Sequence, residues 1–311
     1  MTPIRLASIR SVRRAACLAL ASLLVAGCSV REYAVRSVAD ALTSGGDVYA
    51  SDNDIQLIGA ATPFGLKTIE SLLVTVPDHR GLLLAATRGF TQYAYVYIQA
   101  PADVLEERSV AAAYAQRARA RRMYLRARDY GLRGLGFDSQ EELRALRIEP
   151  VEALATASAE DVPLLYWTAV AWAAAISLSK DDPAIIAGLP IVDALLMRAA
   201  ALDADWDHGT LQTFLIGYEV NRPNAAPNAI ERARRHFTRA VELSDGLQAA
   251  PYVSLAESVA VAERNRAEYV KTLKQALAID TDKRPDWRLA NLVMQRRARW
   301  LLERVDLYFV E

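Results

Sequence analysis

The stretch Pro63–Gln99 decides the fold, and it reads PFGLKTIESLLVTVPDHRGLLLAATRGFTQYAYVYIQ. Apolar residues recur at helical spacing in its first half, and a second helical run begins just after Pro77. Because proline lacks an N–H group and disfavours helix at the preceding residue, Pro77 ends the first helix. The sequence therefore predicts two amphipathic helices that lie antiparallel across a short link. Their apolar faces consist of Leu66, Ile69, Leu72, Leu73, Leu82, Leu83, Ala86, Phe90, Tyr93 and Tyr97.

The remainder of the chain supplies further helical patterns, which the opening pair needs because two helices alone cannot bury both of their faces. Proline, glycine and N-capping residues mark the ends of these patterns. No stretch shows sustained period-two alternation between hairpin turns, so the predicted fold class is all-α. Beyond the opening pair, helices are expected at residues 31–44, 103–132, 140–146, 163–178, 183–202, 207–219, 226–244, 250–263, 265–280 and 287–308.

A weak internal repeat resembles the tetratricopeptide unit, with an alanine, an aromatic residue four positions later and a second alanine three positions after that. Two occurrences fit closely, two fit loosely, and the intervals between them are uneven. The pattern predicts stacked antiparallel helix hairpins in an irregular tetratricopeptide-like α-solenoid, more closed than an open array. Generic packing of alanine-rich helices is the alternative. The repeated positions are Ala120/Tyr124/Ala127, Ala233/Phe237/Ala240, Val192/Leu196/Ala199 and Tyr269/Leu273/Ala276.

The N-terminus has the features of an export signal. Residues 1–14 contain four arginines and no acid, and the apolar run Ala15–Ala26 follows them. This run is too short to span a bilayer, which needs about 20 residues. The sequence Leu24-Val25-Ala26-Gly27-Cys28 resembles the bacterial lipobox, in which the cysteine becomes the lipidated first residue of the mature protein. An ordinary signal with a chance cysteine is the alternative.

Lipidation at Cys28 would anchor the chain in the bacterial envelope. Cys17 lies in the signal, so the mature chain would keep one cysteine, occupied by lipid, and form no internal disulfide. Ser29 rather than aspartate follows the cysteine, which by resemblance to Gram-negative sorting rules favours the periplasmic face of the outer membrane. The expected divisions are 1–27 as signal peptide, 28–50 as lipidated N-terminus and first helix, and 51–311 as a tetratricopeptide-like helical domain.

Composition limits the function classes. Removal of residues 1–27 takes four of the 37 basic residues and none of the 37 acids, which leaves the mature chain acidic. Nucleic-acid-binding domains are usually basic, so we expect no nucleic-acid partner. Hydrophobic residues make up 52% of the chain, enough for a sizeable core. No segment after residue 27 is expected to be long and apolar enough to cross a membrane.

A polar stripe on the second helix of the opening pair is the first candidate binding site. Arg88, Gln92, Tyr95 and Gln99 recur at helical spacing on the side opposite the apolar face. Their fixed hydrogen-bonding groups suit a polar groove or pore, and a solvent-facing surface explains the pattern equally well. Two tryptophans of the apolar helix after Pro163 are either core residues or a wall for a hydrophobic ligand, and they are Trp167 and Trp172.

An arginine-rich helix is the second candidate. Arg117, Arg121 and Arg128 belong to a basic patch that flanks an apolar stripe on both sides. They are candidates for binding an acidic partner surface. Solvated side chains whose stems cover apolar surface, partly paired with nearby acids, are the alternative.

Chemistry-bearing motifs are absent from the sequence. Three scattered histidines and an imperfect calcium-loop start at Asp203–Asp207 lack the spacing of a metal site, so no metal or cofactor is expected. There is no phosphate loop and no nucleophile elbow. A rival enzyme function would need Glu70, Glu106 and Glu107 to share a cleft. Glu106 and Glu107 lie near a predicted helix start, where acids stabilise the helix dipole without taking part in catalysis. We therefore predict a protein that is not an enzyme.

Several segments resemble the T component (TatT type) of tripartite ATP-independent periplasmic (TRAP) transporters. With the lipobox and the helical C-terminal half, the similarity extends over most of the mature chain. The matching segments are 63–73 (PFGLKTIESLL), 82–85 (LLLA), 89–95 (GFTQYAY) and 121–132 (RRMYLRARDYGL).

This resemblance implies a periplasmic lipoprotein built from tetratricopeptide-like helix hairpins. It also implies a partner, the extracytoplasmic solute-binding subunit of a TRAP transporter, and a homotrimer with a central pore. The expected role is that of a scaffold that docks this subunit and channels a small hydrophobic ligand. The alternative is a tetratricopeptide-repeat lipoprotein that helps to assemble outer-membrane or cell-wall complexes.

Overall fold

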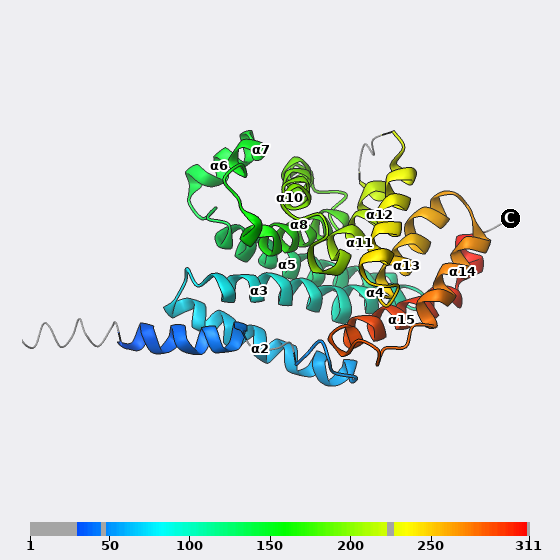
Figure 1. Cartoon of the computed structure of the whole chain (residues 1–311), viewed down its shortest axis with the longest axis horizontal. Coiled ribbons are helices and arrows are strands. Elements are labelled where there is room, and N and C mark those ends of the chain that lie inside the picture. The colour runs from blue at the N-terminus through cyan, green and yellow to red at the C-terminus, as the bar shows by residue number, and fades with distance from the viewer. Residues whose placement is uncertain (1–29, 45–47, 223–226, 310–311) are drawn as a thin grey trace, which may run out of the picture.

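The computed structural model describes residues 30–44, 48–222 and 227–309 (Figure 1). Within these ranges the chain forms helices joined by short links and contains no strand, which confirms the predicted all-α class. The predicted signal peptide and Cys28 lie outside the described residues. The first helix covers residues 30–44, close to the predicted 31–44.

The elements that follow are named as in Figure 1. The N-terminal half contains α2 (Ile55–Thr75), α3 (Arg80–Ala94), the π-helical segment η1 (Tyr95–Gln99), α4 (Ala100–Glu106), α5 (Val110–Gly134), α6 (Gln140–Ile148), α7 (Pro150–Ala153) and η2 (Ala159–Asp161). The C-terminal half contains α8 (Val162–Ser177), α9 (Pro183–Ile186), α10 (Leu189–Leu202), α11 (Trp206–Asn221), α12 (Ala229–Leu243), α13 (Ala250–Leu255), the π-helical segment η3 (Ala256–Ala260), α14 (Arg266–Leu277), η4 (Pro285–Trp287), α15 (Arg288–Leu302) and α16 (Val305–Tyr308).

The helix pair predicted around Pro77 is confirmed as α2 and α3. Helix α2 ends at Thr75, and His79 caps α3, because its Nδ1 accepts a hydrogen bond from the Leu82 N–H over 3.2 Å. Leu66 and Phe90 are buried in one core cluster between the two helices and their neighbours. Proline and an N-capping side chain therefore set the boundary that the sequence pattern indicated.

The long helix predicted at 103–132 is wrong at its start. Helix α4 ends at Glu106 and α5 begins at Val110, with Ser109 between them as an N-cap. The Ser109 hydroxyl accepts a hydrogen bond from the Ala112 N–H over 3.2 Å, which satisfies a donor that would otherwise be free at the new helix end. Helix α5 ends at Gly134, and Gly136 follows with φ of +85°, a left-handed conformation that glycine adopts easily at a helix end.

The positions of the weak repeat are used for helix packing. Tyr124, Leu196, Leu273 and the small residues of their triplets are almost completely buried, while Phe237 is partly buried. Small residues at such points allow neighbouring helices to approach closely. The core is a succession of apolar clusters along the described chain rather than one central mass, which is the arrangement expected when each helix packs mainly on its neighbours.

The C-terminal helices return to the beginning of the fold. Figure 1 shows α15 beside the start of α2. The Leu289 N–H donates to the Ala50 carbonyl over 2.9 Å, and Arg288 Nη1 donates to the Ser51 carbonyl over 2.6 Å. Contacts between segments so far apart in sequence tie the two ends of the described helical array together.

No segment after residue 27 was expected to be long and apolar enough to cross a membrane, and this expectation is wrong. Two helical segments have the required length and apolar composition, Ile55–Thr75 and Pro183–Leu202. The second segment contains the turn between α9 and α10, and α10 lies in a core cluster. In the first segment, α2, only 22% of the most apolar 18 residues are buried, because one side of the helix is exposed.

Candidate functional site

Two π-helical segments interrupt otherwise regular helices. Segment η1 continues α3 into α4, and segment η3 continues α13. A π-helical turn inserts a residue into the helix and rotates the side chains that follow, and such turns are frequent at functional sites. Tyr95 begins η1 and Glu257 lies in η3.

An arginine from α15 connects η3 with α4, the helix that follows η1. Arg297 donates from Nε and Nη2 to Glu257 Oε1, over 3.0 and 2.7 Å. Its Nη1 donates to Asp103 Oδ2 over 2.9 Å. The guanidinium also lies over the ring of Trp300, 4.4 Å from the ring centre. Since only 16% of the Arg297 side chain is exposed, its three donors are fixed in direction by the protein.

The network continues into α5. Arg117 donates from Nη2 to Asp103 Oδ1 over 2.9 Å and to Glu106 Oε2 over 2.6 Å. We call Glu257, Arg297, Asp103, Arg117 and Glu106 the ion cluster. With three carboxylates and two guanidinium groups, it carries one negative charge when all members are ionised.

Burial and neighbouring charges shift the pKa values of groups in and beside the ion cluster. Burial raises the pKa of Glu257, and the charge and hydrogen bonds of Arg297 offset only part of this rise. Burial, together with the negative charge of Glu257, raises the pKa of Tyr95 to about 12. The Tyr95 phenol is therefore neutral at physiological pH. Groups with perturbed pKa values mark this cluster as a candidate functional site.

The predicted polar stripe leads toward this cluster. Arg88 and Gln92 are exposed on α3, whereas Tyr95 and Gln99 are partly buried in η1. Gln99 Oε1 accepts a hydrogen bond from the Tyr124 hydroxyl over 2.6 Å. The stripe thus passes from an exposed end to an enclosed one, and its role in binding stays a prediction.

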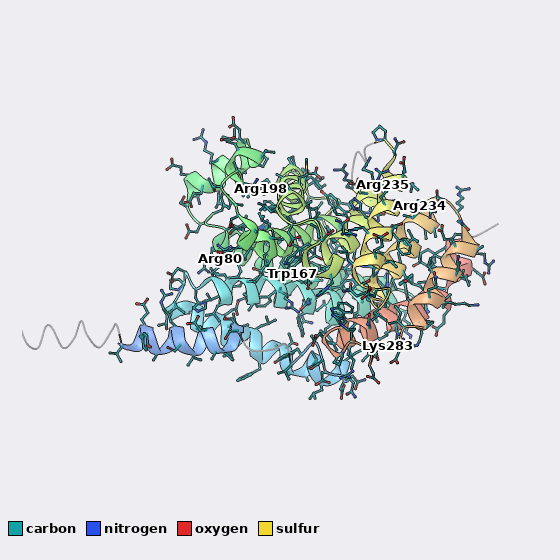
Figure 2. All side chains as sticks on the ribbon, viewed as in Figure 1. Arg80, Trp167, Arg198, Arg234, Arg235 and Lys283 are labelled. Carbon is teal, nitrogen blue, oxygen red and sulfur yellow. The ribbon has the colours of Figure 1, made fainter. Side chains whose placement is uncertain are left out.

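The two predicted tryptophans have different surroundings. Trp167 of α8 is partly buried next to α3, where the Arg88 guanidinium lies 6.0 Å from its ring centre (Figure 2). Trp172 is buried in a core cluster, and Arg128 lies over its ring at 5.1 Å. A ligand-binding role for Trp167 beside Arg88 stays a prediction, while the position of Trp172 is that of a core residue.

The three arginines predicted to bind a partner also differ in their surroundings. Arg117 belongs to the ion cluster, and Arg128 donates to Asp129 besides covering Trp172. Arg121 is partly exposed on α5. A partner that used Arg117 or Arg128 would have to compete with contacts inside the chain.

The three acids considered for a rival enzyme function each have different partners. Glu70 is buried and accepts from Lys67 and from the Tyr130 hydroxyl, over 2.6 and 2.7 Å. Glu106 pairs with Arg117, and Glu107 pairs with Arg304 of the C-terminal part. The placement of the last two at a helix start is wrong, because they lie at the end of α4. Each acid thus stabilises the fold through its own ion pair.

An open cleft lies near the ion cluster, between the start of α2 and the start of α15. Its volume is about 690 Å³. Arg296, the neighbour of Arg297 in the chain, reaches into this region and donates to the Val96 carbonyl over 3.4 Å. The lining residues are Asn53, Asp54, Ile55, Gln56, Thr281, Asp282, Arg288, Leu292 and Arg296.

The sequence analysis missed Glu257 and Arg297. Glu257 is the sole charged residue of the stretch 246–262, and a single acid in an otherwise uncharged helix is the signal that could have identified it. Arg297 lies in a stretch with several arginines, and nothing in its spacing distinguishes it from its neighbours.

Comparison with known proteins identifies the family. The family model described as TRAP transporter T-component matches residues 51–309, which include both π-helical segments and the ion cluster. A protein of Treponema pallidum (strain Nichols), described as "Uncharacterized protein", is 30% identical, and the alignment covers 96% of this chain and 98% of that protein. The family is a transporter component and not an enzyme family, which agrees with the sequence-based prediction. As the segments around Phe64 and Phe90 predicted, the chain belongs to the TRAP transporter T-component family.

Proposed function

We propose that this protein is the periplasmic lipoprotein component of a TRAP-type transport system, where it docks the solute-binding subunit without performing chemistry itself. Membership of the T-component family across residues 51–309 is the observation that carries this proposal. Energy for transport would come from the membrane subunits of the system.

The proposed scaffold is an irregular tetratricopeptide-like stack of helix hairpins. Its support is the packing of successive helices through small buried residues and the return of α15 to α2. A stack that is tied at both ends holds its surface side chains on a rigid frame, which lowers the entropy lost when a partner docks. Three such chains would form the homotrimer that the resemblance implies.

The proposed ligand path follows the polar stripe. Arg88 and Trp167 form its exposed end, and Tyr95 and Gln99 form its enclosed end beside the ion cluster. An aromatic face next to a guanidinium suits a small ligand that is mostly hydrophobic and carries a negative group. The neutral Tyr95 phenol can donate or accept a hydrogen bond farther along.

The proposed location is the periplasm, with a lipid anchor at Cys28 in the outer membrane. The lipobox sequence at residues 24–28 and Ser29 support this location. More than one acyl chain is attached in bacterial lipoproteins, and two chains suffice for stable anchoring where one is marginal.

Affinity purification of the tagged, full-length lipoprotein from a detergent-solubilised envelope tests the proposal. Capture of a TRAP solute-binding protein is the expected result. Capture of barrel-assembly or cell-wall proteins in its place would support the assembly-lipoprotein alternative and refute ours.

A charge reversal then tests the partner surface. Arg121→Glu is the informative variant, because Arg117 and Arg128 hold contacts inside the chain. Arg235→Glu on α12, whose arginine pairs with Glu231 at the surface, is the matched control. Loss of capture with the first variant alone would locate the docking surface on α5, and equal capture with both would exclude it.

A further inference from the structure

Two helices, residues 30–44 and α2, lie along one edge of the molecule (Figure 1). In the helix of residues 30–44, Arg36 pairs with Asp78 at 2.8 Å, and Asp40 pairs with His79 at 3.0 Å. The outward face consists mostly of small and apolar residues, and Arg31 is exposed among them. The small and apolar residues are Val30, Tyr33, Ala34, Ser37, Val38, Ala41 and Leu42.

Helix α2 extends this mostly apolar surface. Its buried Glu70 pairs with Lys67, whose Nζ lies 2.6 Å from Glu70 Oε2, but the Lys67 side chain is itself 67% exposed. Leu57 and Phe64, seven residues apart, share the exposed side with Lys67, and Phe64 is 80% exposed. Exposed apolar surface of this extent marks an interaction site. We call the outward faces of residues 30–44 and α2 the apolar edge.

The position of the predicted lipid anchor indicates what covers the apolar edge. One residue separates Cys28 from Val30, where the first helix begins. Because a chain spans at most about 3.6 Å per residue, the Cα atoms of Cys28 and Val30 are no more than roughly 7 Å apart. An acylated Cys28 would therefore hold the beginning of the apolar edge at the membrane surface.

We propose that the apolar edge lies on the lipid bilayer, with Tyr33, Leu57 and Phe64 at the boundary between headgroups and acyl chains. This inference rests on the lipid anchor of the proposed function. An amphipathic helix that lies in this boundary buries its apolar face there, and it adds a second attachment to that of the lipid. Arg31 and Lys67 at the apolar edge would add an attraction to anionic lipid, which salt screens. The membrane thus fixes the orientation of the whole molecule, with α12 directed away from the bilayer (Figure 2).

Single-cysteine labelling tests this orientation. The mature chain has no cysteine besides Cys28, so a polarity-sensitive nitrobenzoxadiazole dye can be attached at Tyr33→Cys or Phe64→Cys alone. Arg235→Cys on α12 is the matched control, at an exposed position on the far side of the molecule. Each lipidated variant is reconstituted into phosphatidylcholine vesicles with and without doxyl-labelled lipid.

The expected result is a blue shift and several-fold stronger doxyl quenching at Tyr33→Cys and Phe64→Cys than at Arg235→Cys. Equal quenching at all three positions would overturn the inference and leave partner capture untouched. A blue shift that appears without lipid and grows with protein concentration would show that a second copy covers the apolar edge. Mass spectrometry that found Cys28 unmodified would remove the anchor from both proposals.

Discussion

Arg297 in α15 donates a hydrogen bond to Asp103 in α4 over 2.9 Å, although 194 residues separate them in the chain. Arg304 and Glu107 form a second ion pair between the same two regions. These contacts hold the C-terminal helices against the segment that follows η1. The ion cluster is therefore both a candidate functional site and a connection between the ends of the fold.

Substitution of Arg297 tests this connection. Arg297→Leu leaves Glu257 and Asp103 without their shared partner, and removal of one member of a buried ion pair typically costs about 3–5 kcal/mol. We expect a loss near the lower end, about 3 kcal/mol, because the side chains keep some contact with water. Urea denaturation measures the free energy of unfolding.

Arg235→Leu is the control for this experiment. Its pair with Glu231 is exposed on both sides, so the expected loss is below about 1 kcal/mol. Equal losses in the two variants would contradict a structural role for the ion cluster.

The surroundings of Glu70 predict that the free energy of unfolding depends on pH. Burial alone would raise the pKa of Glu70, but hydrogen bonds from Lys67 and Tyr130 and the charge of Arg126 lower it below the ordinary value of 4.5. A lowered pKa in the folded state means that ionised Glu70 stabilises the fold above pH 4.5, and that this contribution is lost as pH falls through the folded-state pKa. Glu70→Gln should therefore destabilise the protein at pH 7 by about 1–3 kcal/mol.

The difference between wild type and Glu70→Gln should shrink as the pH falls below 4.5. Thermal unfolding at pH 7 and at several values below 4.5 measures it. A difference that stayed constant over this range would show that the charge of Glu70 has no part in its effect.

Gly131 permits the close approach of α5 and α8. A Cβ atom at this position would lie 2.0 Å from Thr168 Oγ1, well inside van der Waals contact. Gly131→Ala should therefore cost about 1–3 kcal/mol despite the higher helix propensity of alanine. The double variant Gly131→Ala/Thr168→Ala should recover part of this loss, because it removes the clashing hydroxyl.

Gly217→Ala provides the matched helical control. The nearest atom to a Cβ at position 217 is 3.9 Å away, so the substitution should be neutral or stabilise by up to about 1 kcal/mol. Similar melting temperatures for the two alanine variants would contradict the packing argument.

Trp167 tests the proposed ligand path. The dye 1-anilinonaphthalene-8-sulfonate has apolar rings and one negative charge. The Trp167 ring and the Arg88 guanidinium would favour these two features respectively. Trp167→Leu should raise its Kd about tenfold, which corresponds to about 1.4 kcal/mol. Fluorescence titration measures the Kd, and Tyr114→Leu at an exposed position of α5 should leave it unchanged. Equal Kd values for wild type and Trp167→Leu would place the dye elsewhere.

Local sequence patterns predicted the helices well because their causes are local. Pro77 removes a donor and Gly136 adopts a positive φ after α5, so each of these boundaries depends on a few neighbouring residues. The start of α5 at Ser109 was missed although its cap is equally local. The alanine and aromatic triplets fell on buried helix contacts for the same reason, since period and residue size are visible in the sequence.

The π-helical segments and the ion cluster could not be predicted in this way. Tyr95–Gln99 (YVYIQ) continues the apolar spacing of α3, and nothing in that spacing marks the extra residue in its turn. The pairing of Arg297 with Asp103 depends on the three-dimensional path of the chain between them. Residue spacing carries no information about contacts over such sequence separations.

The return of α15 has a consequence for the order of folding. Arg297 follows its partner Asp103 by 194 residues, and Arg304 follows Glu107 by 197. Such contacts close a long loop, whose entropic cost must be met before the contact contributes to stability. The contacts of α15 with α4 should therefore form late, after the local helix pairs.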